Sequence, residues 1–272
     1  MKNVAFGFRD ADGAILDDLV HCLDFNNGLP FFRAYKAHSW DSLRIRDDQN
    51  ILDVACGIGF DVIELAKLFP LTTFFGVDLS AGFLDIARSR AVVLPNVCFL
   101  KGNSEALPFP DGHFDGVRID RSLQHMKKPH AAIREMVRVT RPDGRIVATE
   151  PDWGTFVLFN GEFDISASLA RQFRGSFRNP CIGRKLGVLF KECGIRNLQC
   201  VIHALCVTDF TSANVVFDLA RVRDQCVELG VMTGEDTRRW WRTSEEASQS
   251  GSFLACLNIV EFNGHRDRND GS

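Results

Sequence analysis

The sequence predicts a doubly wound α/β fold built on a mostly parallel seven-stranded sheet. Seven short apolar runs are separated by amphipathic segments whose apolar residues recur at helical spacing. Strand and helix alternate regularly in the first half of the chain, and such alternation implies right-handed crossovers between parallel strands. The chain has 272 residues, enough for one such domain with a sizeable core.

The expected strands and helices follow from where the apolar residues recur. Strands are expected over residues 51–55, 72–77, 97–100, 114–119, 145–149, 198–204 and 253–260. Helices are expected over 60–68, after Ser80, around 131–139 and over 186–193. Two more are expected between residues 212 and 249, the second opened by Thr233 with Asp236 three residues later. In the turn at 141–144, Gly144 is expected to take the positive φ.

These elements are interpreted as a single domain over residues 1–272. Residues 1–50 are expected to form a helical lid, 51–150 the ligand-binding core, and 151–272 the substrate-side insertions and final strands. Residues 151–180 are interpreted as a loop-rich insertion, and the polar end GHRDRNDGS as frayed.

The composition and charge of the chain indicate which classes of binding partner are expected. The net charge of −3, with scattered Lys and Arg, disfavours a nucleic-acid partner. No apolar run is long enough to span a bilayer, and the N-terminus lacks a secretory pattern, which indicates a cytoplasmic protein without membrane insertion. The nine cysteines show no C-x-x-C spacing and are interpreted as reduced thiols. Scattered histidines without Cys/His spacing predict no metal site, and a homo-oligomer is left open.

A glycine-containing loop follows the first expected strand. Asp53-Val54-Ala55-Cys56-Gly57-Ile58-Gly59-Phe60 leaves that strand and opens a helix. Glycines let a backbone approach a ligand closely, and the N–H groups of a helix N-terminus are free to bind polar ligand atoms. In an open parallel sheet, ligands bind beyond the carboxyl ends of the strands, where this loop lies.

An acidic residue ends the second strand, about 25 residues after Asp53. The carboxylate of Asp78 is placed to accept two hydrogen bonds from ribose hydroxyls. A tight turn and a solvated acid are the structural alternative. The combined order of strand, glycine loop, helix, strand and acid favours a nucleoside-containing cofactor.

The loop favours S-adenosylmethionine over a dinucleotide. A dinucleotide fingerprint needs a third glycine, but bulky residues occupy 60–63. Asp53 suits a ligand that carries an amino group, whereas it would repel a pyrophosphate.

Four blocks resemble the class I S-adenosylmethionine-dependent methyltransferases, in the subgroup of ubiquinone/menaquinone-type and secondary-metabolite enzymes. They are ILDVACGIGFD, FFGVDLS, GNSEALPFPDGHFD and RSLQHMKKPHAAIREMVRVTRPDGRIVATEPDW, and they cover roughly residues 50–155. The resemblance implies a Rossmann-like methyltransferase fold, S-adenosylmethionine as cofactor, S-adenosylhomocysteine as product and a small-molecule acceptor.

The resemblance also implies roles for single residues. The methionine part of the cofactor would be held by Asp53 and the backbone of Ala55, Gly57 and Gly59. The adenosine part would be held by Asp78 at the ribose and by Leu79, Asn103 and Ser104 at the adenine. Ala55 replaces the family's usual glycine, which is tolerable if its dihedrals are ordinary. Asn103 replaces the usual Asp, and its amide oxygen can still accept a hydrogen bond.

Further polar residues are candidates for the methyl-transfer side of the site and for the methionine end of the cofactor. Arg121 and His125 follow the fourth strand, and His125 is the candidate general base, with helix packing or capping as its alternative. Glu150 and Asp152 end the fifth strand and are candidates for acceptor contact, against a turn role imposed by Pro151. Arg33, Tyr35 and Lys36 are expected to close over the methionine carboxylate, with a plain solvated charge as the alternative for Arg33 and Lys36.

The predicted acceptor is a small, largely apolar molecule. The segments outside the core are rich in aromatic residues, namely Phe25, Phe31, Phe32, Trp40, Trp153, Phe156, Phe159, Phe173, Phe177 and Phe217. These side chains line a pocket in one interpretation and only pack the segments onto the sheet in the other. The alternative functions are a cofactor-binding cyclase or pericyclase, a binding module, or a nicotinamide oxidoreductase. The identity of the acceptor, and O-, N- or C-methylation, stay open.

Overall fold

The computed structural model describes residues 12 and 16–267, and its centre is a seven-stranded sheet in the order β3-β2-β1-β4-β5-β7-β6. The parallel strands are β1 (Asn50–Val54), β2 (Thr73–Asp78), β3 (Val97–Lys101), β4 (Phe114–Asp120) and β5 (Thr140–Phe159). Strand β7 (Leu254–Arg266) runs antiparallel to β5 and to β6 (Ile195–Val207). The strand order reverses between β1 and β4, which is where such folds bind ligands. The predicted fold class is confirmed.

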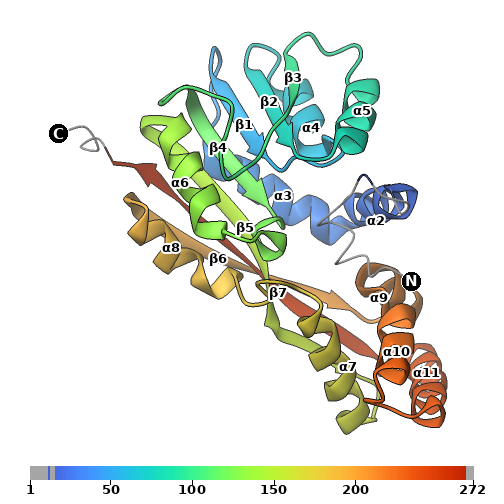
Figure 1. Cartoon of the computed structure of the whole chain (residues 1–272). Coiled ribbons are helices and arrows are strands. Elements are labelled where there is room, and N and C mark those ends of the chain that lie inside the picture. The colour runs from blue at the N-terminus through green and yellow to red at the C-terminus, as the bar shows by residue number, and fades with distance from the viewer. Residues whose placement is uncertain (1–11, 13–15, 268–272) are drawn as a thin grey trace.

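Helices cover both faces of this sheet (Figure 1). One face carries α3 (Pro30–Leu43), α4 (Phe60–Leu68) and α5 (Ala81–Arg90), and the other carries α6 (Pro129–Val139) and α8 (Leu186–Glu192). Helix α2 (Leu16–Gly28) packs against α3 and α5 at the ligand-binding edge.

Local sequence signals place several element boundaries. The side chain of Ser80 accepts a hydrogen bond from the Phe83 N–H, and that of Thr233 accepts one from the Asp236 N–H, so each caps a helix as predicted. The turn at 141–144 differs from prediction. Asp143, not Gly144, takes the positive φ of 60°, and these residues are part of β5.

The last three strands are longer than predicted and extend beyond the core. Strand β5 continues to Phe159, so its register with β7 persists through Val157↔Cys256 to Phe159↔Leu254 after a register shift. The interpretation of 151–180 as loop-rich is therefore wrong, since α7 (Phe163–Gly175) follows directly. The end of the chain is also more ordered than expected, because Gly264–Arg266 pair in β7. Residues 268–272 lie outside the described part.

A helical subdomain packs on this extension, at the end far from β1–β3 (Figure 1). It contains α7, α9 (Phe210–Phe217), α10 (Leu219–Glu228) and α11 (Gly234–Gln249). Three helices thus lie where two were predicted between 212 and 249, because Asp218 takes a left-handed φ of 51° and separates α9 from α10. Aromatic side chains fill its core; Trp153 stacks on Phe177 with ring centroids 4.4 Å apart.

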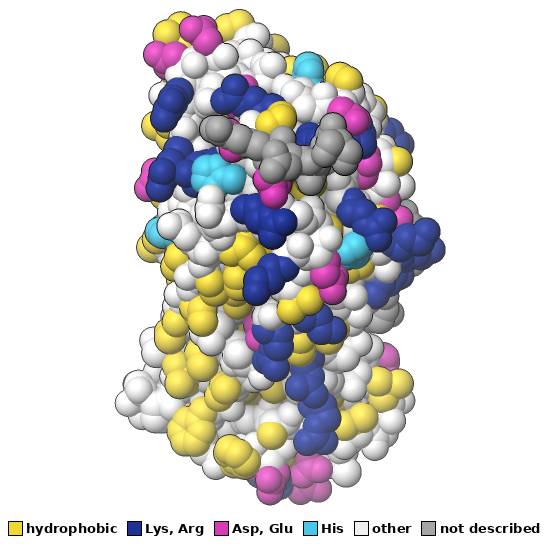
Figure 2. Space-filling model, turned by 90° about the vertical axis from the view of Figure 1, so that its left-hand side faces the viewer, with side chains coloured by type: hydrophobic (Ala, Val, Ile, Leu, Met, Phe, Trp, Pro, Cys, Tyr) yellow, Lys and Arg dark blue, Asp and Glu magenta, His cyan; other side chains and the backbone are white. Residues whose placement is uncertain are grey.

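The surface brings together charges that are scattered in the sequence. Lys and Arg side chains follow one another down one face, beside an area of hydrophobic side chains (Figure 2).

Within residues 12 and 16–267, no helix is long and apolar enough to cross a bilayer. All nine cysteines lie in this described part and none forms a disulfide.

Trp240 packs in the core of the helical subdomain, and we expect it to contribute strongly to the stability of this subdomain. Its side chain is fully buried, and its indole Nε1 donates to Ser166 Oγ at 2.8 Å. Trp240→Ala should lower the free energy of unfolding by about 3–5 kcal/mol, because it leaves a cavity and removes a buried donor. The adjacent Trp241 is half-buried, so Trp241→Ala is the matched control, with an expected loss below about 1.5 kcal/mol. Equal losses in chemical denaturation would contradict this assignment.

Candidate functional site

Two adjoining cavities lie at the carboxyl ends of the strands. The larger, of about 590 Å³, lies over β1, β2 and β4 and is called the cofactor cavity here. The other, of about 510 Å³, lies between the sheet and the helical subdomain and is called the acceptor cavity. Five residues line both: Cys22, Asn26, Arg121, Gln124 and His125. The two cavities therefore meet at the loop that follows β4.

The glycine loop and Asp78 form one wall of the cofactor cavity. Gly57 and Gly59 have φ of 54° and 75°, and a Cβ on Gly59 would lie 2.7 Å from the Phe99 ring. The carboxylate of Asp78 accepts hydrogen bonds from the N–H groups of Gly57 at 2.8 Å and Ser80 at 2.9 Å. Since a carboxylate has about four acceptor positions, two are left for hydroxyls of a ligand.

Ala55 was expected to be tolerated in place of the family's usual glycine only if its backbone dihedrals were ordinary, and they are not. Its φ is 56°, in the left-handed region that costs a residue with a Cβ about 1–2 kcal/mol. Because Ala55 lines the cofactor cavity, the strain lies where the backbone approaches the ligand. The family's usual glycine would adopt this conformation without that cost.

A cluster of buried charges lies beneath the cofactor cavity. Its members are three carboxylates and three cations: Asp53, Asp61, Asp120, Lys36, Arg118 and Arg121. Arg118, on β4, is 1% exposed and lies 2.9 Å from Asp53, 3.3 Å from Asp61 and 3.9 Å from Asp120. Lys36 on α3 pairs with Asp61 and, at 2.9 Å, with Asp120. These opposite charges compensate one another away from water.

The cluster shifts the pKa values of its acids in opposite directions. Burial raises the pKa of Asp53 to about 7, although Arg118 acts against this shift. Burial also disfavours the charged form of Asp61, but Arg118 and Lys36 outweigh it and hold the pKa of Asp61 below its usual range. Both Asp53 and Asp61 line the cavity, so a cationic group of a ligand would face two carboxylates there.

Two asparagines of α2 carry unpartnered oxygens at this cavity. The Oδ1 atoms of Asn26 and Asn27 are buried and accept no hydrogen bond from the described residues. Both residues line the cofactor cavity. A buried acceptor without a donor costs about 1–3 kcal/mol, so a ligand with N–H or O–H groups fits here.

The structure brings most of the predicted cofactor residues to the cavity. Leu79, Asn103 and Ser104 line it. Leu79 is 62% exposed, and Asn103 Oδ1 already accepts from the Glu105 N–H at 2.9 Å, which leaves one lone pair. Arg33 is not among the lining residues: it is exposed, and its Nε donates to the Asn27 carbonyl at 3.1 Å. The structure does not bring Arg33 to the cavity, whereas Lys36, which was predicted to act with it, does line the cavity.

The loop after β4 is held by a buried carboxylate. Glu150, 0% exposed, accepts hydrogen bonds from the N–H groups of Ser122 at 2.7 Å, Leu123 at 2.6 Å and Gln124 at 3.3 Å. Glu150 lines neither cavity, so the interpretation of Glu150 as an acceptor contact is wrong. It orients the loop from which Arg121 and His125 reach both cavities.

Arg121 and His125 lie where the cavities meet. Arg121 has a positive φ of 50°, and its guanidinium lies 4.7 Å from the Phe32 ring centroid and 3.7 Å from Asp120. The His125 ring lies 5.7 Å from that of Phe177. Asp152 lines neither cavity, because it is buried in an ion pair with Arg184 at 2.6 Å, so it is not an acceptor contact either.

Apolar side chains form most of the wall of the acceptor cavity. Five of the predicted aromatic residues line it: Phe32, Trp153, Phe173, Phe177 and Phe217. The others do not; Phe156 packs behind the wall, Trp40 donates to Asp61, and Phe159 is 45% exposed. Both interpretations of the aromatic residues therefore hold, each for part of the set.

Sequence reasoning did not single out Asp61, Arg118, Asn26 or Asn27. For Arg118 a signal was available: a cation within a strand expected to be buried in a parallel sheet needs acidic partners. Asp61, in the first turn of α4, directly follows the glycine loop in the sequence. The two asparagines carry no such signal, because only the packing of α2 brings them to the cavity.

The buried carboxylate of Glu150 should make stability depend on pH. Burial raises the pKa of Glu150 from 4.5 to about 8 in the folded chain, although the hydrogen bonds from the loop N–H groups act in the opposite direction. The folded state therefore binds more protons than the unfolded state between these pH values, and stability falls as pH rises through this window. Relative to Glu150→Gln, the wild type should lose on the order of a few kcal/mol of unfolding free energy from pH 4.5 to 8. Parallel pH profiles in urea unfolding would refute this.

Comparisons with known proteins show which family the chain is similar to. Residues 52–148 match the family described as methyltransferase domain. The chain is 34% identical over 229 residues (84% of this chain) to an uncharacterized 37.1 kDa protein in transposon TN4556 of Streptomyces fradiae, spanning 65% of its length. It is 35% identical over 173 residues (55% of this chain) to a demethylmenaquinone methyltransferase of Symbiobacterium thermophilum, spanning 69% of that protein.

A solved structure shares the fold. The Bacillus protein YcgJ superposes with a TM-score of 0.63 at 19% identity, covering 87% of this chain and all of that one. The four sequence blocks, the sheet order and these relatives agree. The chain belongs to the S-adenosylmethionine-dependent methyltransferase family.

Proposed function

We propose that this protein transfers a methyl group from S-adenosylmethionine to a small, largely apolar organic acceptor. The observation that carries the proposal is the junction of two cavities at Arg121 and His125. One cavity has the acidic and glycine-rich wall that suits the cofactor, and the other has an aromatic wall. One relative of the chain is named demethylmenaquinone methyltransferase.

The residues of the cofactor cavity match the chemical groups of S-adenosylmethionine. Asp53 offers a carboxylate to the amino group, with Asn26 and Asn27 as further acceptors. Asp78 offers its two remaining acceptor positions to the ribose hydroxyls, while Leu79, Asn103 and Ser104 lie on the adenine side. Gly57 lines the cavity and lets the loop backbone come close to the ligand, whereas Gly59 does not line it and packs closely against Phe99 and Ala87.

When bound, S-adenosylmethionine would supply an electrophilic methyl group, carried on a sulfonium, to a nucleophilic atom of the acceptor. The protein has to align the two molecules and exclude water, which contributes several kcal/mol to such a displacement. The aromatic wall and the Glu150-anchored loop serve this alignment. His125 takes the proton when the attacking atom carries one.

Product analysis tests the function. The full chain, incubated with S-adenosylmethionine and a panel of apolar quinones, phenols and amines, should release S-adenosylhomocysteine in proportion to methylated product. Conversion of an acceptor without S-adenosylhomocysteine release would favour the cyclase alternative. Binding of the cofactor with no conversion of any acceptor would favour a binding module.

The ribose assignment predicts a specific loss of affinity. Asp78→Ala should weaken S-adenosylmethionine binding by at least about 2 kcal/mol, roughly thirtyfold, because two hydroxyls lose their acceptor. Calorimetric titration measures this, with unfolding checked in parallel because Asp78 also orders Gly57. The exposed acid Asp85 is the control, and Asp85→Ala should bind normally. Unchanged affinity in Asp78→Ala would exclude the assignment.

The position of His125 predicts an effect on turnover rather than on cofactor binding. For an acceptor that loses a proton, His125→Ala should lower kcat by about a hundredfold or more and change the cofactor Kd little. His113, which stacks against Phe109 and lines neither cavity, is the control. If His125→Ala weakens cofactor binding but keeps kcat, the packing role is the correct one.

A further inference from the structure

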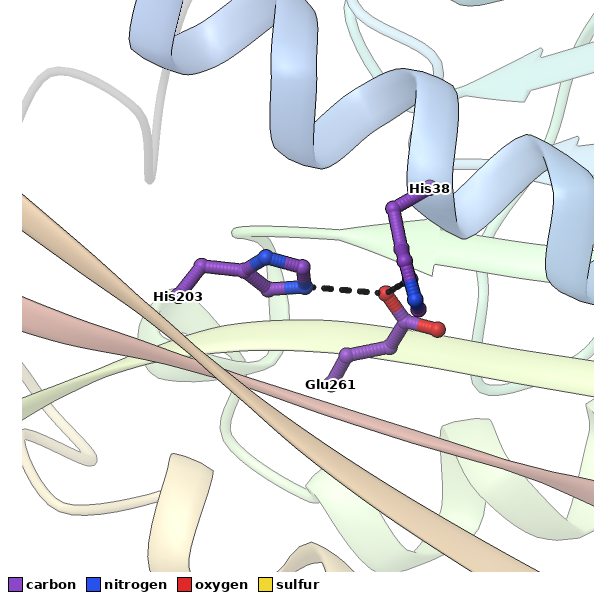
Figure 3. Close-up of side chains that lie close together, drawn as sticks. All are labelled: His38, His203 and Glu261. Atoms are coloured by element: carbon purple, nitrogen blue, oxygen red, sulfur yellow. Dashed lines mark hydrogen bonds and ion pairs between the residues drawn. The ribbon is translucent and has the colours of Figure 1, made fainter.

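Two histidines and a glutamate converge behind α3, outside both cavities (Figure 3). His38 comes from α3, His203 from β6 and Glu261 from β7. Their ligand atoms all lie within 4.8 Å of one another. No local metal-binding pattern is present in the sequence, because these residues are 165 and 58 positions apart.

Both imidazoles point at one carboxylate oxygen. His38 Nδ1 lies 2.9 Å and His203 Nε2 lies 3.1 Å from Glu261 Oε2 (Figure 3). Ligand atoms bound tetrahedrally to Zn²⁺ at about 2.0–2.1 Å are about 3.3 Å apart. Small rotations of the three side chains would therefore open this triangle enough to coordinate an ion.

The charge of Glu261 favours a cation at this position. Its side chain is 0% exposed, and its ion-pair partners in the described part of the chain are only the two histidines. A buried carboxylate is costly unless cations compensate its charge, and a divalent ion would supply that compensation. Two imidazoles and one carboxylate are also a ligand set that zinc-type ions use.

The second layer of contacts already orients the carboxylate. Ser42 Oγ donates to Glu261 Oε1 at 2.7 Å, which turns the other oxygen toward the histidines. Such outer contacts hold metal ligands in position and typically change metal affinity 10- to 100-fold when removed. His38 is 46% exposed, so an ion can enter from solvent.

We propose that His38, His203 and Glu261 form a binding site for a divalent transition-metal ion of the zinc type, which clamps α3 onto β6 and β7. Helix α3 also carries Phe32, at the acceptor cavity, and Lys36, at the cofactor cavity. The ion is placed to stiffen the helix that both cavities share. The proposal does not depend on methyl transfer, since the three ligands line neither cavity.

Metal titration of the chelator-treated full chain tests the site. Zn²⁺ should bind at one ion per chain, raise Tm and slow amide exchange in α3. His38→Ala should weaken binding more than a hundredfold, and Ser42→Ala by about 10- to 100-fold. The matched control is His130→Ala, because His130 faces Glu192 at 3.5 Å in a pair that has no third ligand among the described residues.

Co²⁺ substitution distinguishes this site from surface thiols. The spectrum should show nitrogen and oxygen ligands and should survive Cys200→Ser, which removes an exposed thiol of β6. Glu261→Gln should abolish binding, and His38→Ala keeps the test valid if that buried variant fails to fold. No saturable binding, undiminished binding in His38→Ala, or a thiolate spectrum lost in Cys200→Ser would each overturn the proposal.

Discussion

The guanidinium of Arg118, buried in the middle of β4, is the constraint on which the site depends. It lies within 4 Å of carboxylates from β1, from α4 and from the end of β4. Removing the cation would leave the buried Asp53 without an ion-pair partner among the described residues, and an uncompensated buried charge costs several kcal/mol. Lys36 adds the fourth element, since it brings α3 onto two of the same acids. One network thus holds the floor of the cofactor cavity together with the helix that covers it.

The long antiparallel strands connect this floor to the rest of the molecule. Strands β5 and β7 pair with the parallel core at one end and carry the helical subdomain at the other. The acceptor cavity lies where that subdomain meets the sheet, so its wall combines strand residues such as Leu257 with helix residues such as Phe217. Because Glu150 lies on β5 itself, the strand also holds the loop that carries Arg121 and His125.

The charges at the site divide between structure and ligand. Asp61 and Arg118 form ion pairs within the protein, and these ion pairs stabilise the fold. Asp78 has two protein donors and two further acceptor positions, while Asn26 and Asn27 have oxygens with no donor in the described part of the chain. A site that leaves acceptors unsatisfied at one cavity and apolar surface at the next is suited to bind two chemically different molecules side by side.

The sequence by itself determined the elements that depend on neighbouring residues. The buried strand before the glycine loop, the helix caps at Ser80 and Thr233, and the acid at the end of β2 are local patterns, and the structure has them where they were predicted. Asp53, Asp78, Asn103 and His125 lie in the sequence blocks that resemble the family, and all four line the cavities. Their positions also follow from local patterns. Tertiary structure alone decided the positive φ of Ala55, the exposure of Arg33 and the anchoring role of Glu150. It also decided the continuation of β5 past residue 150 and the meeting of His38, His203 and Glu261. These features arise from contacts between segments far apart in the chain. No local sequence pattern predicts the free energies of such contacts.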